Sequence, residues 1–401
     1  MNAAVINTCN YGSTGRIGRG LYKYLKSHGH NAIFCYGRGR PAHKDSFFKF
    51  SWDIEVFLHI LLARMTGLEG CFSFIATFRL KKKLKKQNID TVYLLNIHGY
   101  VLNEYHLLQF LKVSQYKVIY LMLDEYPFTG KCGFTMECSE FEKECRRCPQ
   151  KRVYPKSLFF DTANYLFKKK KEAYSGFNNI IFVGIDYTVQ RAKKSILLKD
   201  KSFFIADEAI DLKNVYTLRN CKILKDRLKI PEDKKIIVCV APFSNIRKGC
   251  SYFLKAARML EDKRDIIFVH VGFDGNPSIC PSNYIPIGFI SDQNELAEYY
   301  SLGDLFVFPS LAETIPSTCL QALACGTPIL GFNISGMPYC ADHLHGQFVE
   351  PKNAKALAEK ILEAPRKTPE IKRSCRAYAE SRFDEQDYFR KLVNLAETNF
   401  N

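Results

Sequence analysis

The sequence places one carboxylate in a setting that favours ligand binding. Glu313 lies within FPSLAETIPSTCLQALACGTPILGF, residues 308–332. An apolar run over 304–308 predicts a buried parallel strand, and Pro316 suits the first turn of a helix that we expect to end at Gly326. Glu313 is therefore expected in a loop between the carboxyl end of a strand and a helix N-terminus, where open α/β sheets bind ligands and anions. On spacing alone, an ordinary strand–helix–strand unit with an incidental acid is an equal alternative.

Two cations occupy a similar junction earlier in the chain. Arg247 and Lys248 precede Gly249, between a predicted strand over 235–241 and a helix expected from Cys250. Two cations beside a helix N-terminus favour a pyrophosphate group. A solvated loop pair is the alternative.

A glycine-bearing turn follows the first predicted strand, residues 3–8. The turn covers 10–15 and contains Gly12 and Gly15, with Ser13 or Thr14 expected to cap the next helix. Such a loop can hold a phosphate or a sugar hydroxyl through backbone N–H groups. The two glycines do not have the GxGxxG spacing, so a tight turn without a ligand is equally favoured.

His98 and Asp124 each follow a predicted strand, over 91–95 and 117–123. The carboxyl ends of parallel strands share one edge of a sheet, so both side chains are expected at the same edge. His98 is a candidate for catalysis or acceptor binding. A histidine that is hydrogen-bonded within its own loop is the alternative.

Four cysteines form a cluster in the sequence, with the spacing C-x5-C-x6-C-x2-C. Four thiolates can bind zinc tetrahedrally, although the first spacing is wider than usual. Free thiols or a disulfide pair in an insertion loop are the alternatives. The chain has 15 cysteines and no export signal, so most of them are expected to be reduced. The four are Cys132, Cys138, Cys145 and Cys148.

Around these residues, strand and helix patterns alternate twice. The chain has 401 residues, 47% of them hydrophobic, which suggests two domains with parallel sheets covered on both faces. Residues 53–87 look helical, and 212–234 reads as the crossover between domains. From residue 353 the chain is helical, and its last helix, about 385–398, is expected to return to the first domain.

The net charge of +17 requires an explanation. The charge is clustered in RLKKKLKK (79–86) and KKKK (168–171), and Phe78, Leu80 and Leu84 give the first cluster a partly apolar stripe. Anionic lipid headgroups and simply solvated helix faces explain the clusters equally well. No zinc-finger or RNA-binding signature accompanies them, so nucleic acid is not an expected partner.

The chain has no apolar run long enough to span a bilayer, and its first residues lack the pattern of a signal peptide. A cytoplasmic location is therefore expected. This expectation is compatible with association with the inner face of the plasma membrane.

Several motifs, in order, carry a resemblance to a known family. They are GSTG after the first strand, NIHGYVLN, FTGKC followed by CP and YP, IRKG, and PSLAETIPSTCLQALACGTPI. Together they resemble retaining glycosyltransferases of family 4, and bacterial enzymes of capsule, O-antigen and exopolysaccharide assembly in particular. The resemblance implies an α/β GT-B fold, with two Rossmann-like domains whose parallel sheets face each other across a cleft.

The resemblance also implies a domain plan. It assigns 1–211 to an acceptor-binding domain with a cysteine-containing insertion over 130–150, and 212–234 to a linker. Residues 235–383 would bind the nucleotide sugar, and 384–401 would cross back to the first domain.

Roles carry over to matching positions. Glu313 matches the first glutamate of the family's E-x7-E motif, which contacts the donor sugar, and Gln321 stands where the second glutamate grips the ribose. Lys248 matches the lysine that binds the donor phosphates, and Arg247 is expected to compensate for Pro242, where the family often has an arginine. The stretch around Gly288 matches the loop that holds the base. The remaining residues assigned to the donor site are Gly12, Gly15, Thr314, Ile315 and Pro316.

One departure concerns the reacting sugar. Many relatives have a histidine directly before the aspartate that matches Asp124, and this chain has Leu123 there. His98 is expected to substitute in part. The residues assigned to catalysis are therefore Glu313, His98 and Asp124.

The resemblance implies transfer of a sugar from a nucleoside diphosphate to a glycan acceptor, lipid-linked and at a membrane surface, without a catalytic metal. A catalytically weak homologue that binds nucleotide sugar or glycan as an assembly subunit is the alternative, motivated by Leu123, Pro242 and Gln321. An epimerase acting on a nucleotide sugar is a third hypothesis, disfavoured by the FTGKC and cysteine region.

Overall fold

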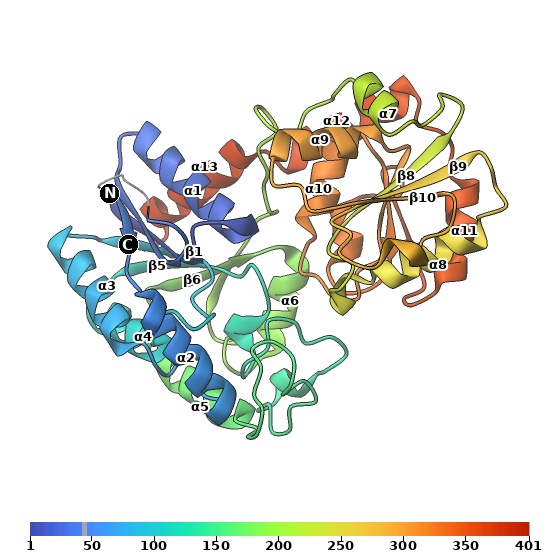
Figure 1. Cartoon of the computed structure of the whole chain (residues 1–401). Coiled ribbons are helices and arrows are strands. Elements are labelled where there is room, and N and C mark those ends of the chain that lie inside the picture. Colours follow the sequence, from blue (N-terminus) through green and yellow to red (C-terminus); the bar gives the residue numbers. More distant parts are fainter. Residues whose placement is uncertain (42–45, 401) are drawn as a thin grey trace. The chain divides into compact units, whose positions relative to one another are not determined.

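The computed structural model describes residues 1–41 and 46–400. These residues form two compact units (Figure 1). The first unit contains Met1–Asp207 and the chain from Gln386 onward, and the second contains Glu208–Glu385. Both are built on a parallel sheet with helices on its faces, so the predicted α/β class with two Rossmann-like domains is confirmed.

The first unit has a seven-stranded sheet in the order β3-β2-β1-β4-β5-β6-β7. Its apolar strands are buried on both faces, as parallel strands between helices require. Ala4 and Ile6 pack in the core under α3, α4 and α5, while Val5 between them points to the opposite face. The strands are β1 (Asn2–Cys9), β2 (Asn31–Arg38), β3 (Phe47–Lys49), β4 (Thr91–Leu94), β5 (Lys117–Leu121), β6 (Ile180–Gly184) and β7 (Ser202–Ile205).

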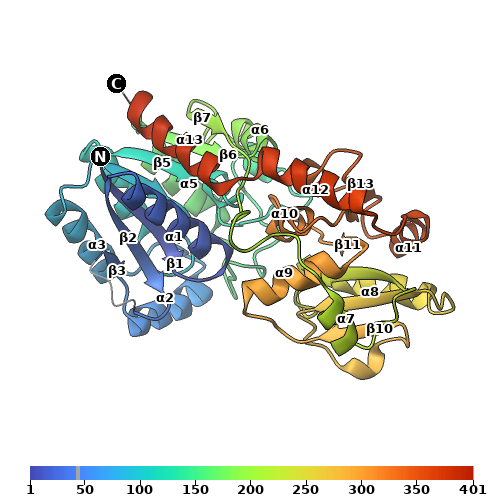
Figure 2. The same cartoon turned by 90° about the horizontal axis from the view of Figure 1, so that it is seen from above.

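Helices cover both faces of this sheet (Figure 2). The last helix, α13, packs beside α1, where the rings of Tyr24 and Phe389 are 5.9 Å apart. The Tyr93 hydroxyl on β4 donates a hydrogen bond to the carbonyl of Leu392. The helices are α1 (Gly12–Ser27), α2 (Asp53–Thr66), α3 (Phe74–Lys86), α4 (Glu104–Val113), α5 (Ala163–Tyr174), α6 (Asp186–Lys194) and α13 (Glu385–Thr398).

The second unit has a six-stranded parallel sheet in the order β10-β9-β8-β11-β12-β13. The strands are β8 (Lys235–Val240), β9 (Ile266–Val271), β10 (Tyr284–Ile287), β11 (Leu305–Phe308), β12 (Ile329–Phe332) and β13 (Gly346–Val349). The helices are α7 (Lys222–Arg227), α8 (Cys250–Met259), α9 (Gln293–Leu302), α10 (Ser317–Ala324), α11 (Ala354–Glu363) and α12 (Pro369–Arg382).

The structure differs from the expected elements in two places in the first unit. The helical region over 53–87 is two helices, because Gly67 ends α2 in a left-handed conformation, with φ of 79°. Helix α1 begins at Gly12, so Ser13 and Thr14 lie inside its first turn and do not cap it. Thr14 instead accepts a hydrogen bond from the Asn7 amide at 3.1 Å.

The segment over 212–234 is part of the second unit and contains α7. Arg376 on α12 holds it, since the Arg376 guanidinium donates to the carbonyls of Leu212 and Tyr216 at 2.8 and 2.5 Å. The half-buried Arg376 thus fixes a stretch whose charge and weak periodicity had suggested a crossover.

The basic clusters are not uniform solvated faces. Leu80 and Leu84 of α3 are fully buried, whereas Phe78 is 66% exposed. The predicted apolar stripe therefore splits between the core and the surface. Within 168–171, Lys170 is buried and donates to the carbonyls of Tyr126 and Thr129 at 2.7 and 3.1 Å. No helix in the described ranges is long and apolar enough to cross a membrane.

Candidate functional site

The second sheet has a topological switch point between β8 and β11. These strands are neighbours, but the chain proceeds from β8 to β9 on one side and from β11 to β12 on the other. Ligands of open α/β sheets bind outside the carboxyl ends of strands at such a point. Arg247 and Lys248 follow β8, and Glu313 follows β11. The fold therefore brings the two predicted junctions together.

The three side chains form one ion-pair cluster. The Lys248 ammonium lies 2.6 Å from Glu313 Oε1, and the Arg247 guanidinium lies 2.8 Å from the same oxygen. Arg247 also donates to the carbonyl of Ala312 at 2.6 Å. The Glu313 side chain is 8% exposed, so the cations contact it in a largely desolvated setting.

Glu313 is ionised in this environment. Burial opposes ionisation, but the attraction of Lys248 and Arg247 outweighs it and holds the pKa of Glu313 below its ordinary value of 4.5. Two cations and one carboxylate leave the cluster with one net positive charge. Such a cluster can accept a phosphate group on its cations and hydrogen-bond hydroxyls through its carboxylate.

Gly249 allows the loop after β8 to lie close to the loop after β11. Its φ is 64°, and a Cβ at this position would lie only 1.9 Å from the Pro309 carbonyl oxygen. Beside it, Leu311 donates its backbone N–H to the Arg247 carbonyl at 2.7 Å. The loop after β8 therefore rests directly on the loop after β11, which only glycine allows.

The residues after Glu313 complete the loop. Thr314 and Ile315 are buried, and the Thr314 hydroxyl has no hydrogen-bond partner among the described residues. Pro316 is the N-cap of α10, one position before the first turn in which it was expected. Gly336 anchors the loop by donating its N–H to the Glu313 carbonyl at 3.1 Å.

Two other predicted donor residues lie in different surroundings. Gln321 on α10 is buried, and its Oε1 accepts a hydrogen bond from the Tyr300 hydroxyl at 2.7 Å. Its oxygen is therefore engaged in the core, which leaves the amide N–H groups for any ligand. Gly288 follows β10, and a Cβ there would meet nothing within 4 Å. This loop has open space beside its backbone.

The first sheet has its own switch point, between β1 and β4. His98 follows β4, and Asp124 follows the neighbouring β5. The two side chains meet, with His98 Nε2 lying 3.2 Å from Asp124 Oδ2, and the His98 ring stacks on Tyr126 at 4.2 Å. Burial disfavours the imidazolium, but Asp124, Glu69 and nearby Glu104 outweigh it and raise the pKa of His98.

Sequence reasoning missed Glu69, which lies between α2 and α3. Its Oε1 accepts the backbone N–H groups of Gly99 and Tyr100 at 2.8 and 3.1 Å, so it fixes the turn after His98. Burial raises the pKa of Glu69 to about 7. No local signal marks this residue, because it lies inside a stretch that read as continuous helix.

Arg38 was also missed. It ends β2, next to the β1 strand, and its guanidinium lies 5.7 Å from the ring centre of Tyr100. Its Nε and Nη2 atoms are buried without a hydrogen-bond partner in the described part of the chain. Buried donors of this kind are costly unless a ligand or water meets them. A position at the carboxyl end of a strand is the signal that could have revealed it.

The turn after β1 holds Gly12 and Gly15. Gly12 has φ of 69°, and a Cβ at Gly15 would lie 2.7 Å from the backbone carbon of Asn10. Close packing of the turn therefore accounts for Gly15 without a ligand. Donor binding by either glycine stays a prediction.

The four predicted zinc ligands are free cysteines around one small cavity of about 20 Å³. Burial raises the pKa of Cys145 to about 12, although the N–H of Gly130 hydrogen-bonds its sulfur. Among described residues, the only three potential ligands with atoms all within 4.8 Å of one another are Cys239, Cys250 and His270. Zinc at the four cysteines stays a prediction, which metal analysis of the purified protein would test.

Residues 221–382 match the model of the family described as Glycosyl transferases group 1. The Campylobacter jejuni N,N'-diacetylbacillosaminyl-diphospho-undecaprenol alpha-1,3-N-acetylgalactosaminyltransferase is 33% identical over 133 residues, which are 32% of this chain and 35% of the relative. The putative teichuronic acid biosynthesis glycosyltransferase TuaC of Bacillus subtilis is 28% identical over 34% of this chain and 35% of its own. The chain thus spans about a third of the length of these two relatives.

Other similarities extend further along the chain. The putative colanic acid biosynthesis glycosyl transferase WcaC of Escherichia coli K12 is 24% identical over 78% of this chain and 76% of its own. Among solved structures, sucrose-phosphate synthase from Thermosynechococcus elongatus superimposes with a TM-score of 0.72 at 15% identity, over 100% of this chain and 99% of its own. WaaG, a glycosyltransferase involved in lipopolysaccharide biosynthesis, gives a TM-score of 0.67 at 15% identity. The superposition covers 99% of this chain and 100% of WaaG. Residues 221–382 therefore form a group 1 glycosyl transferase domain, in a chain whose two parallel-sheet units have the GT-B type of fold.

Proposed function

We propose that this protein is a retaining glycosyltransferase that moves a sugar from a nucleoside diphosphate to a glycan acceptor in bacterial cell-surface polysaccharide assembly. The observation that carries the proposal is the cluster of Arg247, Lys248 and Glu313 at the switch point of the second sheet. The names of the relatives, which include colanic acid and teichuronic acid biosynthesis, support the same process.

The cluster suits the donor half of this reaction. When the bond between the anomeric carbon and the diphosphate breaks, negative charge develops on the leaving oxygen. Lys248 and Arg247 would stabilise that charge, and the Glu313 carboxylate would hold hydroxyls of the donor sugar and fix its position. The unpartnered hydroxyl of Thr314 offers one more hydrogen bond beside it.

We place the acceptor half at the switch point of the first sheet. The acceptor hydroxyl would attack the anomeric carbon from the face that the diphosphate leaves, and the leaving diphosphate oxygen would take its proton. The configuration at the anomeric carbon is then retained, and no metal is needed. His98 and Asp124 would orient the reacting groups, and the unused donors of Arg38 suit an anionic group on the acceptor.

A lipid-linked acceptor is the finer part of the proposal. The Campylobacter jejuni relative is named for a diphospho-undecaprenol substrate. An acceptor of that class carries phosphate groups, which agrees with the buried, unpartnered donors of Arg38. The lipid would require the protein to work at a membrane surface.

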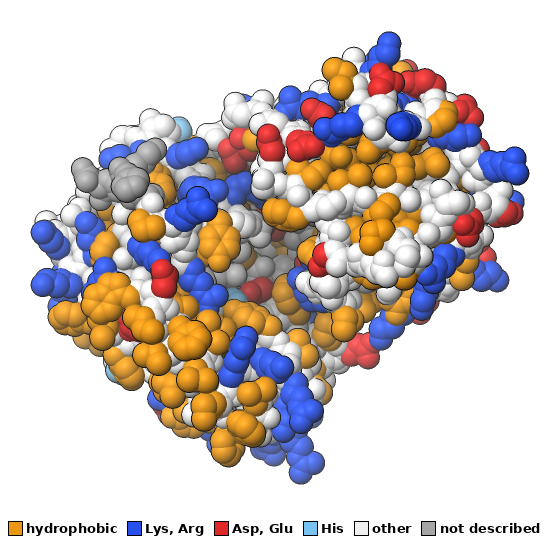
Figure 3. All heavy atoms as spheres, viewed as in Figure 1, with side chains coloured by type: hydrophobic (Ala, Val, Ile, Leu, Met, Phe, Trp, Pro, Cys, Tyr) orange, Lys and Arg blue, Asp and Glu red, His pale blue; other side chains and the backbone are white. Residues whose placement is uncertain are grey.

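An apolar face on α2 and the start of α3 supports membrane contact. Side chains of this face are 40–66% exposed, unlike those of a helix packed in a core. Orange side chains gather over α2 in Figure 3, with blue Lys and Arg side chains near them. The exposed apolar residues are Trp52, Ile54, Phe57, Leu58, Leu61, Leu62, Met65, Phe74, Ile75 and Phe78.

Charge adds a second signal on the same elements. Lys82, Lys85 and Lys86 are exposed on α3, which continues from this face. Stable membrane binding takes two signals, such as buried apolar area and attraction to anionic headgroups. We therefore propose that α2 and the start of α3 lie in the headgroup region of an anionic membrane, with α3 supplying the charge.

The test is a screen of common nucleotide sugars with diphospho-undecaprenol-linked acceptors, followed by determination of the anomeric configuration of the product. We expect transfer from one donor with retention. Inversion would overturn the mechanism, and the absence of donor binding and of transfer with every donor would overturn the function.

One observation favours a second candidate, a catalytically weak homologue that binds nucleotide sugar as an assembly subunit. Gln321, expected at the ribose, has its oxygen engaged by Tyr300, and Leu123 occupies the position where relatives have histidine. Calorimetry that detects donor binding, together with no transfer in the screen, would select this candidate.

A further inference from the structure

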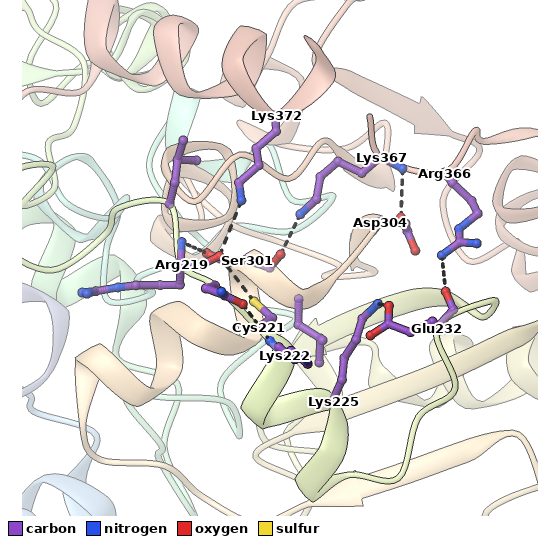
Figure 4. Close-up of a pocket in the computed structure, with 13 residues that line it drawn as sticks. Arg219, Cys221, Lys222, Lys225, Glu232, Ser301, Asp304, Arg366, Lys367 and Lys372 are labelled. Carbon is purple, nitrogen blue, oxygen red and sulfur yellow. Dashed lines mark hydrogen bonds and ion pairs between the residues drawn. The ribbon is translucent and has the colours of Figure 1, made fainter. Parts of the chain in front are cut away.

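A polar pocket lies in the second unit, at the opposite end of strand β11 from Glu313. Asp304 lines this pocket directly before β11, whereas Glu313 follows that strand. The pocket has a volume of about 740 Å³, within the usual range of small-molecule sites. Its walls come from the segment 218–225, the end of α9 with Asp304, and the stretch 366–372 that enters α12 (Figure 4).

The lining is strongly cationic. Figure 4 shows Lys367 and Lys372 entering from the α12 side and Lys225 rising from α7. Only two carboxylates, Glu232 and Asp304, line the same pocket. The cationic residues are Arg219, Lys222, Lys225, Arg366, Lys367 and Lys372.

The two carboxylates neutralise only part of the charge of the six cations. Glu232 pairs with Lys225 at 2.9 Å. Asp304 accepts the backbone N–H groups of Ile236 and Lys367 at 2.8 and 2.9 Å, and its charge offsets part of that of the Lys367 ammonium. The pocket therefore retains an excess of positive charge.

The other cations have only neutral partners or none. The Lys367 ammonium donates to the Ser301 carbonyl and the Thr327 hydroxyl, both at 2.7 Å. Lys372 lies 3.5 Å from the Arg219 carbonyl. Lys222 is exposed, and its ammonium has no hydrogen bond or ion pair with any residue that the structure describes.

The pKa of Lys367 reflects this imbalance. Burial, with a smaller contribution from Lys372, lowers it to about 8 against the opposing effects of Asp304 and Cys221. An anion in the pocket would remove part of this cost, because it would stabilise the charged form of both lysines.

We propose that this pocket binds a small soluble ligand that carries two or more phosphate groups. Four ammonium groups from two segments, 218–225 and 366–372, line one cavity, which suits a compact polyanion better than a single carboxylate. A concave pocket of this volume also suits a small molecule better than a nucleic-acid strand, which needs an extended cationic surface. The site is separate from the Glu313 cluster and does not depend on the proposed transferase activity.

Inorganic pyrophosphate is the probe, titrated calorimetrically into the full chain. A Lys248→Gln background weakens binding at the Glu313 cluster, and the pocket variants are compared within that background. We expect Lys222→Gln with Lys372→Gln to weaken the affinity by about tenfold or more. Matched neutralisation of two α11 lysines, Lys355→Gln with Lys360→Gln, should leave it unchanged, and circular dichroism should show that every variant is folded.

Equal affinity in the pocket and α11 variants would overturn the proposal. A vesicle arm separates a soluble ligand from a lipid headgroup. If pyrophosphate does not bind while phosphatidylglycerol vesicles bind in a manner that depends on Lys222 and Lys372, the pocket is a lipid site and the proposal is wrong. Pyrophosphate binding that phosphatidylglycerol vesicles do not displace supports it.

Discussion

At the scale of single residues, the proposed donor site is built on one carboxylate that two cations share. Burying the Glu313 carboxylate alone would be costly, and the attraction of its two cationic neighbours offsets that cost. Lys248 and Arg247 both contact the same oxygen, so removing the carboxylate would leave two like charges close together. Breaking a buried pair from one side costs far more than the pair itself contributes.

This arrangement predicts a pH-dependent effect of Glu313→Gln. The pKa of Glu313 in the folded protein lies below 4.5, so its charge stabilises the fold above about pH 4.5. This stabilisation is lost as the pH falls through the folded pKa. At pH 7 the variant should be less stable than the wild type by about 3 kcal/mol. Denaturation followed from pH 7 down to pH 3.5 should show the difference shrinking, and a difference that grows toward acid would contradict the ion-pair cluster.

Gly249 offers a second test at this scale. Gly249→Ala adds a Cβ against the Pro309 carbonyl in a left-handed conformation, and should destabilise the second unit by about 3 kcal/mol. Gly29→Ala is the matched control, since Gly29 has φ of 81° but nothing within 4 Å of an added Cβ. Its cost should be about 1 kcal/mol. Scanning calorimetry that finds equal costs would show that the two loops do not rest on each other.

At the scale of elements, the sequence supported most strands and the residues that follow them. Apolar runs at β1, β4, β5, β8, β9 and β11 are unambiguous because both faces of a parallel strand are buried. Glu313, Lys248, His98 and Asp124 could therefore be predicted as strand-end residues. The meeting of Glu313 with Lys248 depends on strand order, which no local pattern contains.

Other features depended on contacts between distant segments. Glu69 binds the turn after His98 across 30 positions of sequence, and Gln321 is engaged by Tyr300 on another helix. Gly67 ends α2 and so separates it from α3. Leu80 and Leu84 bury one side of the basic helix α3 in the core. Composition alone could not distinguish these buried leucines from the exposed ones on α2.

The α2 face predicts a membrane phenotype. Phe57→Asp with Leu61→Asp should weaken binding to phosphatidylglycerol-containing vesicles by about a hundredfold, because two exposed apolar side chains would no longer enter the headgroup region. Leu344→Asp, at an exposed apolar residue of the second unit, is the control. Co-sedimentation measures the effect, and equal losses in both variants would remove α2 as the binding face.

At the scale of the whole molecule, each unit carries polar residues at the switch point of its own sheet. A nucleotide-sugar donor bound as proposed would order the loops after β8 and β11. Hydrogen exchange should slow in peptides covering 242–250 and 309–316 when the donor is added, while 354–363 on α11 stays unchanged. Protection that appears on α11 but not after β8 would place the donor elsewhere.

The family match lies within one of the two units, so it does not by itself establish the activity of the whole chain. The match to the group 1 domain covers 221–382, so it lies within the second unit and includes the Arg247, Lys248 and Glu313 cluster. The first unit, with His98, Asp124 and Arg38, lies outside the matched range. The proposed acceptor site therefore rests on the chemistry of these first-unit residues and not on the family match.

The most direct test of the central proposal is the rate of sugar transfer by Glu313→Ala, measured with the donor that the screen identifies. We expect the rate to fall by about a hundredfold or more, since the carboxylate would no longer position the donor sugar. Glu359→Ala, on an exposed position of α11, should transfer at the wild-type rate. Undiminished transfer by a folded Glu313→Ala protein would contradict the account.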